Sequence, residues 1–375
     1  MEFFDVAIIG GGIIGGSIAL ELAQRKLSVI ILDRQQPGRE ASWAAAGMLA
    51  PVLDSPADAP LMPLAKASLR LYPDFVAAVE SASGLATGFR RGPTIHAFFA
   101  PHGESERNTM IADLRRVDVA AEAISVAEAR GAEPALAESV RAAVLLPEEA
   151  SVEPRILTEA VLAAAAQNGV HIRTGVPVTS LLQEGSRVTG VIAGCDKISA
   201  GKVVLAAGCY SGGIEGLGRY APTHPVRGQM VALRPASDTL SHVLRSHRGY
   251  VVPRNNGRIV AGSTLENAGF EKYVTPAGLR QILDAAVELA PALSDAAVLE
   301  TWAGLRPGTP DELPLLGPTD LEGLLIATGH YRNGILLAPV TAKLIREWIV
   351  EGRTSEAVER FSPLRFLEVR RGASR

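Results

Sequence analysis

The segment DVAIIGGGIIGG at residues 5–16, followed by VIILD at residues 29–33, determines how the rest of the sequence is interpreted. Residues 5–9 form a short apolar run, which is typical of a strand buried on both faces of a parallel sheet. Glycines come next, and apolar residues at helical spacing follow over residues 18–23. The second apolar run ends at Asp33. This order predicts strand, glycine-rich turn, helix and strand, which together form a right-handed βαβ unit.

The first, third and sixth residues of the run GGGIIG have the spacing of a dinucleotide-binding motif. That spacing alone is a weak signal, but here it follows a strand, opens a helix and precedes an acidic residue at the next strand end. We expect Gly10 to make the tight turn, Gly12 to let the backbone approach a pyrophosphate, and Gly15 to let the helix pack closely on the strand. The helix N-terminus offers free N–H groups to the phosphates. Asp33 can accept hydrogen bonds from ribose hydroxyls, which argues against a 2′-phosphate and so against NADP.

The composition indicates a folded protein that handles something small. A length of 375 residues suggests about two domains, and 47% hydrophobic with 21% charged residues excludes a disordered chain. A net charge of −3 gives no support for binding nucleic acid or an anionic membrane. No apolar run reaches the roughly 18 residues of a membrane span, and no basic targeting segment is visible. Two cysteines cannot build a disulfide framework or a thiolate zinc site, so we expect no metal site and a cytoplasmic location.

The later elements change type along the chain. Buried runs of the parallel type return at residues 203–208 and 324–327. Residues 226–233, 250–252, 259–261 and 298–302 alternate in the antiparallel manner. Helices are predicted over residues 69–79, 105–130, 156–167, 276–289 and 338–350.

This order predicts two domains threaded through each other. The fold class is α/β, or α+β overall, with a Rossmann-like nucleotide-binding domain interleaved with a substrate domain on a largely antiparallel sheet. The first domain is expected to comprise residues 1–53, 150–220 and 303–375. The second is expected to comprise residues 54–149 and 221–302.

Four further motifs indicate to which protein family the sequence is similar. They are ASWAAAGM at residues 41–48, VVLAAG at 203–208, WAGLRPGTPD at 302–311 and GHYRNGILLAP at 329–339. Together with the first unit they resemble the D-amino acid oxidase superfamily of flavoproteins, specifically the glycine oxidase branch linked to thiamine biosynthesis. The last two motifs are long and specific, and the resemblance covers the chain to about residue 350. It implies that the first domain binds FAD, without NAD.

The resemblance also implies how FAD is held. Some relatives, the sarcosine oxidases, attach FAD through a cysteine near the position of Arg306, and no cysteine follows Cys209 here, so we expect a non-covalent flavin. Small residues at positions 42–48 would lie against the isoalloxazine. Backbone N–H groups of residues 330–336 would face the flavin edge that becomes negative on reduction. The residues expected to bind the cofactor are Gly10, Gly12, Ile13, Ile14, Gly15, Asp33, Arg34, Ala41, Ser42, Ala46, Gly47, Met48, Val176, Gly208, His330, Tyr331, Arg332, Asn333, Gly334, Ile335 and Leu336.

Arg306 is the strongest candidate for holding a substrate. In the family an arginine here forks onto the substrate carboxylate, and a guanidinium can make two parallel charge-assisted bonds where lysine cannot. From the residues alone, a structural ion pair with an acid such as Asp311 is an equal alternative. The family counterpart of Tyr250 hydrogen-bonds the carboxylate, and that of Arg332 lies near the substrate amine and the flavin. These three residues form the expected catalytic set.

The resemblance implies oxidative deamination of glycine or another small amino acid of the class that includes sarcosine and D-alanine. Hydride would pass to flavin N5, dioxygen would reoxidise the flavin and yield hydrogen peroxide, and the imine could feed thiazole formation. Relatives often form dimers or tetramers, so a homo-oligomer is expected. The alternatives are a D-amino acid dehydrogenase with another electron acceptor, a sarcosine-type oxidase and a non-catalytic flavin-binding scaffold. An NAD-linked dehydrogenase fits least well.

Overall fold

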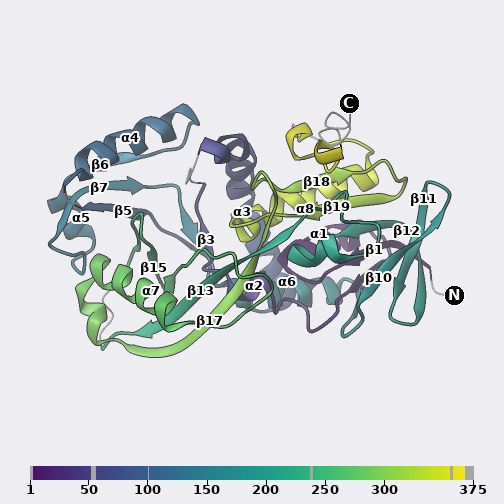
Figure 1. Ribbon diagram of the computed structural model, residues 1–375, viewed down its shortest axis with the longest axis horizontal. Coiled ribbons are helices and arrows are strands. Elements are labelled where there is room, and N and C mark those ends of the chain that lie inside the picture. The colour runs from purple at the N-terminus through teal and green to yellow at the C-terminus, as the bar shows by residue number, and fades with distance from the viewer. Residues whose placement is uncertain (1–2, 52–55, 100, 237–239, 355–357, 368–375) are drawn as a thin grey trace.

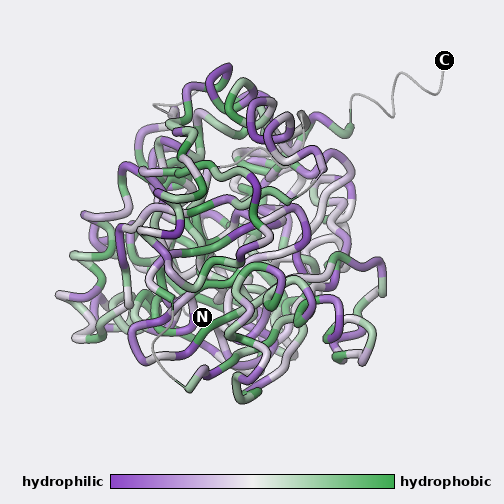
Figure 2. Tube along the Cα trace, turned by 90° about the vertical axis from the view of Figure 1, so that its left-hand side faces the viewer, coloured by the Kyte–Doolittle hydropathy of each residue, from purple (hydrophilic) through white to green (hydrophobic). Residues whose placement is uncertain are grey.

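Two large sheets form the framework of the protein. The computed structural model describes residues 3–51, 56–99, 101–236, 240–354 and 358–367. Its strands form two eight-stranded sheets and one three-stranded sheet. Figure 1 shows the two large sheets in opposite halves of the molecule, with β13 and β17 running between them. Hydrophobic and hydrophilic stretches alternate along the trace, as expected where elements have one buried side (Figure 2).

The first sheet is built around β1 (Phe3–Ile9). On one side of it lies β2 (Val29–Leu32) and then β9 (His171–Arg173), all parallel. On the other side lies β12 (Asp196–Leu205) and then β19 (Leu324–Thr328), also parallel. Three antiparallel strands extend this sheet: β10 (Val178–Glu184), β11 (Arg187–Ala193) and β18 (Leu315–Pro318). The parallel strands come from the start, middle and end of the chain, as predicted.

Helices cover one face of this sheet. They are α1 (Ile13–Gln24), α6 (Pro154–Gln167) and α8 (Gly334–Val350). Along β1, Val6 and Ile8 belong to the core under these helices, whereas Ala7 and Ile9 belong to a second core on the opposite face. This alternation follows from the two-residue period of a strand. The predicted βαβ unit is therefore present, with α1 between β1 and β2.

The second large sheet has the strand order β17-β13-β16-β15-β14-β5-β7-β6. Neighbours are antiparallel except β14 and β5, which are parallel. Its strands are β5 (Thr94–Phe99), β6 (Glu122–Ile124), β7 (Val140–Leu146), β13 (His224–Arg234), β14 (Val243–Arg245), β15 (Tyr250–Pro253), β16 (Ile259–Gly262) and β17 (Ala297–Gly308). Helix α7 (Pro276–Leu289) packs on this sheet, and its N-cap is Thr275, whose hydroxyl accepts the Gly278 N–H at 3.1 Å. The predicted fold class is confirmed.

The prediction of one helix over residues 105–130 is wrong. Helix α4 (Gly103–Arg116) ends before Asp118, which has a left-handed φ of 55°. The chain then forms β6 and starts α5 (Val126–Ala132) at Ser125, whose side chain completes a capping box with Glu128. The prediction failed because charged residues at helical spacing lie on both sides of the short strand β6.

Helix α8 begins at Gly334, four residues earlier than predicted, so Pro339 lies inside it. Proline cannot donate the bond that would reach the Ile335 carbonyl. The Tyr72 hydroxyl donates to that carbonyl instead, at 2.6 Å, and the Ser68 hydroxyl donates to the Leu336 carbonyl at 2.6 Å. Both hydroxyls come from α3 (Met62–Ser83), and neighbouring side chains therefore let the helix pass through a proline.

The division into two domains stays a prediction. Helix α3 falls within the expected substrate domain, yet it packs against α6 and α8. Strand β17 crosses the expected boundary at residue 302. The remaining α-helix is α2 (Ala41–Ala44), and the remaining strands are β3 (Met48–Leu49), β4 (Arg90–Arg91) and β8 (Ala150–Ser151). In the described ranges, no helix combines the length and apolar character that crossing a bilayer would require.

Candidate functional site

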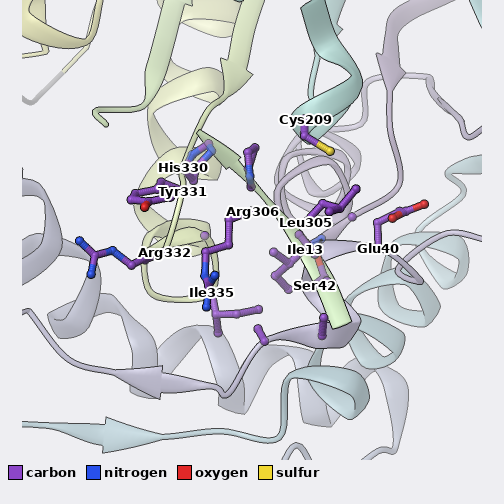
Figure 3. Close-up of a pocket in the computed structure, with 18 of the residues that line it drawn as sticks. Ile13, Glu40, Ser42, Cys209, Leu305, Arg306, His330, Tyr331, Arg332 and Ile335 are labelled. Carbon is purple, nitrogen blue, oxygen red and sulfur yellow. Dashed lines mark hydrogen bonds between the residues drawn. The ribbon is translucent and has the colours of Figure 1, made fainter. Parts of the chain in front are cut away.

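A cavity of about 610 Å³ runs between the two halves of the molecule. One end is lined by the glycine-rich turn, Asp33 and Glu40, and the other by Tyr250 and Arg306. Figure 3 shows Arg306 and Arg332 on one side of this pocket and Glu40 and Cys209 on the other. The cavity lies at the carboxyl ends of the parallel strands, where open α/β sheets bind their ligands.

The glycine-rich turn has no room for side chains. Gly10 has a φ of +104°, and a Cβ atom there would lie 2.5 Å from the Ala206 carbonyl oxygen. A Cβ atom at Gly15 would lie 1.9 Å from the Gly10 carbonyl oxygen. Gly12 is the N-cap of α1, and the next N–H, of Ile13, donates to the Ser42 hydroxyl at 2.9 Å. The turn therefore leaves a bare backbone surface at a helix N-terminus, which fits a pyrophosphate.

Asp33 stabilises the turn as well as facing the cavity. Its Oδ2 accepts the Gly11 N–H at 2.8 Å, and its Oδ1 accepts the Gln35 N–H at 3.0 Å. Both distances are typical of N–H···O hydrogen bonds. A carboxylate has about four acceptor sites, so lone pairs remain for the hydroxyls of a ribose. The residue thus fits the role expected for the nucleotide of FAD while it also holds the phosphate-binding turn in place.

Charged and aromatic side chains surround the same end of the cavity. The Arg34 guanidinium lies 3.4 Å from the centre of the Tyr210 ring and pairs with Glu40 at 2.8 Å. Lys272, from the loop before α7, reaches Glu40 at 3.0 Å. The Phe270 ring stacks on Tyr210 with centroids 5.1 Å apart. A loop of the second sheet therefore contacts the nucleotide end of the cavity.

Arg306 projects from β17 into the other end of the cavity (Figure 3). Its guanidinium donates to the Ser263 hydroxyl at 2.7 Å, to the Thr264 carbonyl at 3.1 Å and to the Arg227 carbonyl at 3.4 Å. Within the part of the chain that the structure describes, no carboxylate pairs with it. Burial lowers the pKa of Arg306, and the nearby phenol groups of Tyr250 and Tyr331 oppose that shift. Neutral oxygens thus orient a half-buried cation whose charge has no anionic counterpart among the described residues.

Asp311, the alternative partner for Arg306, pairs with a different arginine. Asp311 binds Arg365 through two hydrogen bonds of 2.8 and 2.9 Å. This fork ties the chain after α8 to the loop that follows β17. Asp311 is therefore engaged elsewhere.

The other two candidate catalytic residues also line the cavity. Tyr250 begins β15, and its hydroxyl lies near Arg306 and 3.5 Å from the Met230 sulfur. Arg332 lies in the turn before α8, with its guanidinium 5.1 Å from the Tyr331 ring centre. The structure brings Tyr250, Arg306 and Arg332 together around one end of the cavity, although their roles stay predictions.

His330 is a neutral structural residue by its surroundings. It is buried, and its Nε2 lies 3.0 Å from the Thr341 hydroxyl in α8. Burial lowers its pKa to about 3. The imidazole is therefore uncharged near neutral pH, and it orients the turn that carries Tyr331 and Arg332.

His96 is a second histidine whose pKa is lowered by burial. Together with His330 it predicts that the stability of the fold depends on pH. Burial, Arg245 and His247 lower the pKa of His96 to about 3. In the unfolded chain both imidazoles return to about 6.5, so the unfolded state binds more protons and stability falls as the pH drops below that value. At pH 5 we expect a loss of about 2 kcal/mol for each histidine relative to neutral pH.

Urea unfolding at pH 7 and pH 5 measures this loss. The variants H96Q and H330Q should each remove about half of the difference between the two pH values. Equal pH dependence in both variants and the wild-type chain would contradict the assignment.

The structure places most of the expected cofactor residues at the cavity wall. Gly15, Val176 and Leu336 lie behind it. Gly15 packs α1 on the turn, the Val176 N–H donates to the Asp33 carbonyl at 2.8 Å, and Leu336 is a buried residue of α8. The residues that line the wall are Gly10, Gly12, Ile13, Ile14, Asp33, Arg34, Ala41, Ser42, Ala46, Gly47, Met48, Gly208, His330, Tyr331, Arg332, Asn333, Gly334 and Ile335.

Sequence reasoning missed several residues of the cavity wall: Glu40, Cys209, Tyr210, Arg245, Arg248 and Ser263. Cys209 and Tyr210 directly follow the VVLAAG motif, and Arg248 comes shortly before Tyr250, so adjacency to a predicted site was the available signal. Burial and Glu40 raise the pKa of Cys209 to about 12, so it carries a neutral thiol. Ser263 lies far along the chain from Arg306, and no local pattern relates the two.

Comparison with known proteins points to one family. The sequence profile described as DAO, FAD dependent oxidoreductase, matches residues 5–348. The chain is 34% identical over 350 residues to glycine oxidase of Pseudomonas putida, covering 92% of this chain and 93% of that protein. It is 40% identical over 371 residues to the bifunctional protein ThiO/ThiG of Synechocystis, covering 97% of this chain and 54% of that protein. The chain thus spans about half the length of such bifunctional relatives.

A solved structure agrees with the sequence comparisons. The crystal structure of glycine oxidase from Geobacillus kaustophilus superimposes with a TM-score of 0.92 at 30% identity, covering 96% of this chain and 98% of that one. The similarity therefore extends over both large sheets.

Proposed function

Because this chain belongs to the DAO family of FAD-dependent oxidoreductases, we propose that it oxidises glycine or another small amino acid. FAD is the cofactor of the family. The substrate class rests on one observation: the half-buried guanidinium of Arg306 is held by neutral oxygens at the cavity wall. The similarity to proteins named glycine oxidase over nearly their whole length supports a small substrate.

We infer that the two ends of the cavity divide the ligands between them. The glycine-rich turn and Asp33 would hold the pyrophosphate and ribose of FAD. The backbone of residues 42–48 and the backbone N–H groups of residues 330–336 would face the flavin ring. The attachment is non-covalent in this proposal, because the cavity's Cys209 carries a neutral, buried thiol.

Arg306 and Tyr250 would fix the substrate by its carboxylate. Two parallel N–H···O bonds from a guanidinium set both the position and the direction of that group. The α-carbon then has a fixed place, which is the main requirement for a reaction without a covalent enzyme intermediate. The positive charges of Arg306 and Arg332 favour the neutral form of the substrate's amine.

No side-chain base is needed in this mechanism. The chemistry that FAD supplies when bound is acceptance of two electrons, as a hydride equivalent at N5, and their transfer to dioxygen, which gives hydrogen peroxide. His330 stays neutral and bonded to Thr341, so it holds the turn rather than moving a proton. The resulting imine hydrolyses to a keto acid, or glyoxylate in the case of glycine, and ammonia.

We also propose that the imine serves thiamine thiazole synthesis. The supporting observation is the similarity to a protein named ThiO/ThiG, of whose length the chain covers 54%. Homo-oligomer formation is part of the same proposal, and light scattering of the purified protein would measure it.

Anaerobic titration tests the proposed function. Glycine added to the FAD-loaded protein without oxygen should bleach the visible flavin absorbance, because electrons enter the ring and have no acceptor. Admission of air should restore the colour and produce one peroxide per turnover. A flavin that no small amino acid bleaches would contradict the proposal and favour a non-catalytic scaffold.

The same assay separates the rival activities. Bleaching followed by slow reoxidation in air, but fast reoxidation by a quinone, would indicate a dehydrogenase. Initial rates with glycine, sarcosine and D-alanine would separate a glycine oxidase from a sarcosine-type oxidase.

A further inference from the structure

Arg254 connects the second sheet to the segment that lines the middle of the cavity. It lies in the turn between β15 and β16, and its side chain is only 7% exposed. One terminal nitrogen, Nη1, donates to the Val152 carbonyl at 2.8 Å. The other, Nη2, donates to the Ala46 carbonyl, and Nε lies 3.3 Å from a carboxylate oxygen of Glu153. One guanidinium thus contacts two separate stretches of backbone.

One of those two stretches forms part of the cavity wall, and the other packs behind it. Ala46, Gly47 and Met48 line the cavity. The Val152 N–H donates to the Gly47 carbonyl at 2.9 Å, and a Cβ atom at Gly47 would lie 2.1 Å from the Val152 carbonyl oxygen. The stretches are therefore in direct contact, and Arg254 binds the carbonyl groups on both sides of that contact.

Burial makes these bonds costly to lose. Burial is the main cause that lowers the pKa of Arg254, and the Glu153 carboxylate opposes it. The Nε has no hydrogen-bond partner and makes only the ion pair with Glu153. Removing this buried cation therefore leaves two carbonyl groups without a donor and the Glu153 carboxylate without this countercharge. The Ala46 carbonyl would then be free to turn, and with it the peptide that joins Ala46 to Gly47.

A second arginine of the same turn provides a comparison. Arg258 pairs with Glu300 at 2.7 Å, and Glu300 is also held by a fork from Arg155 at 3.0 Å. No hydrogen bond recorded for Arg258 reaches residues 46–48. Its loss leaves Glu300 with a partner and breaks no hydrogen bond to residues 46–48.

We propose that Arg254 is a positioning residue that fixes the backbone of residues 46–48 where the flavin ring is bound. This inference rests on the proposed placement of the flavin ring against that segment. The hairpin that carries Arg254 begins at Tyr250, which lies beside Arg306. One rigid hairpin therefore sets both the substrate end of the cavity and the wall that faces the flavin.

The test compares R254M, R254K and R258M in the full chain. Apoprotein is titrated with FAD by quenching of flavin fluorescence, and visible circular dichroism reports the asymmetry around the bound ring. We expect R254M to weaken FAD binding by about tenfold or more and to alter the flavin dichroism. R258M should keep both within about threefold of wild type. R254K keeps the charge beside Glu153 but lacks the two terminal nitrogens that bind the Val152 and Ala46 carbonyls together. It should therefore resemble R254M.

Chemical rescue distinguishes positioning from general destabilisation. Guanidinium ion at concentrations well below those that unfold the protein should restore the flavin dichroism of R254M, whereas sodium chloride should not. If R254M does not fold, R254K decides the question. If R254M and R254K bind FAD with wild-type affinity and show wild-type flavin dichroism, the proposal is overturned. A wild-type chain that binds FAD but oxidises no amino acid would instead refute the proposed function and leave the role of Arg254 intact.

Discussion

Replacing Arg306 by leucine is expected to lower kcat/KM for a small amino acid by about 30-fold or more while FAD stays bound. The guanidinium is half-buried and donates to neutral oxygens, so a carboxylate is the group that would balance its charge. Leaving that carboxylate unpaired in a dry pocket costs about 2–5 kcal/mol. The glycine-rich turn is at the opposite end of the cavity, and flavin binding should therefore persist.

A substrate without a carboxylate makes this prediction specific. The wild-type protein should prefer glycine to methylamine strongly, and R306L should lose most of that preference. R306K keeps the charge but loses the fork, and we expect an intermediate loss. Thermal melting and the ratio of flavin to protein absorbance control for damage to the fold. Wild-type kcat/KM with glycine in R306L would exclude Arg306 from the substrate site.

The nucleotide end of the site was predictable because its chemistry is local in sequence. The turn needs glycine at fixed offsets, and Asp33 must end the next strand, so one βαβ unit contains the whole pattern. The parallel and antiparallel runs likewise reveal the fold class, because a strand buried on two faces differs in composition from one buried on a single face.

The remaining parts depend on contacts between distant segments. The bonds from Arg306 to Ser263, and from Arg254 to Ala46, join residues that the sequence separates by 43 and 208 positions. The start of α8 was misjudged because proline normally marks the first turn of a helix. The hydroxyl of Tyr72, from another helix, replaces the bond that this proline cannot make. Such compensation has no local signature in the sequence.

Substituting Gly15 by alanine should produce a protein without flavin. The new Cβ atom would lie 1.9 Å from the Gly10 carbonyl oxygen and 3.3 Å from the Ile8 side chain. The first of these contacts involves backbone, so helix α1 would have to move away from β1. That movement displaces the helix N-terminus and the turn that would receive the pyrophosphate. We expect an affinity for FAD lower by about 100-fold or more, together with a lower melting temperature.

The adjacent glycine provides the control. A Cβ atom at Gly16 would meet side-chain atoms of Val161 and Leu162 at 3.1 and 3.2 Å, and those side chains can adjust. Alanine also favours a helix over glycine by about 1 kcal/mol, which offsets part of that contact. G16A should therefore purify yellow, whereas G15A should purify colourless and regain little colour when FAD is added. A G15A protein with wild-type flavin content would show that α1 can shift without opening the turn. The cofactor site would then not depend on the close packing of helix on strand.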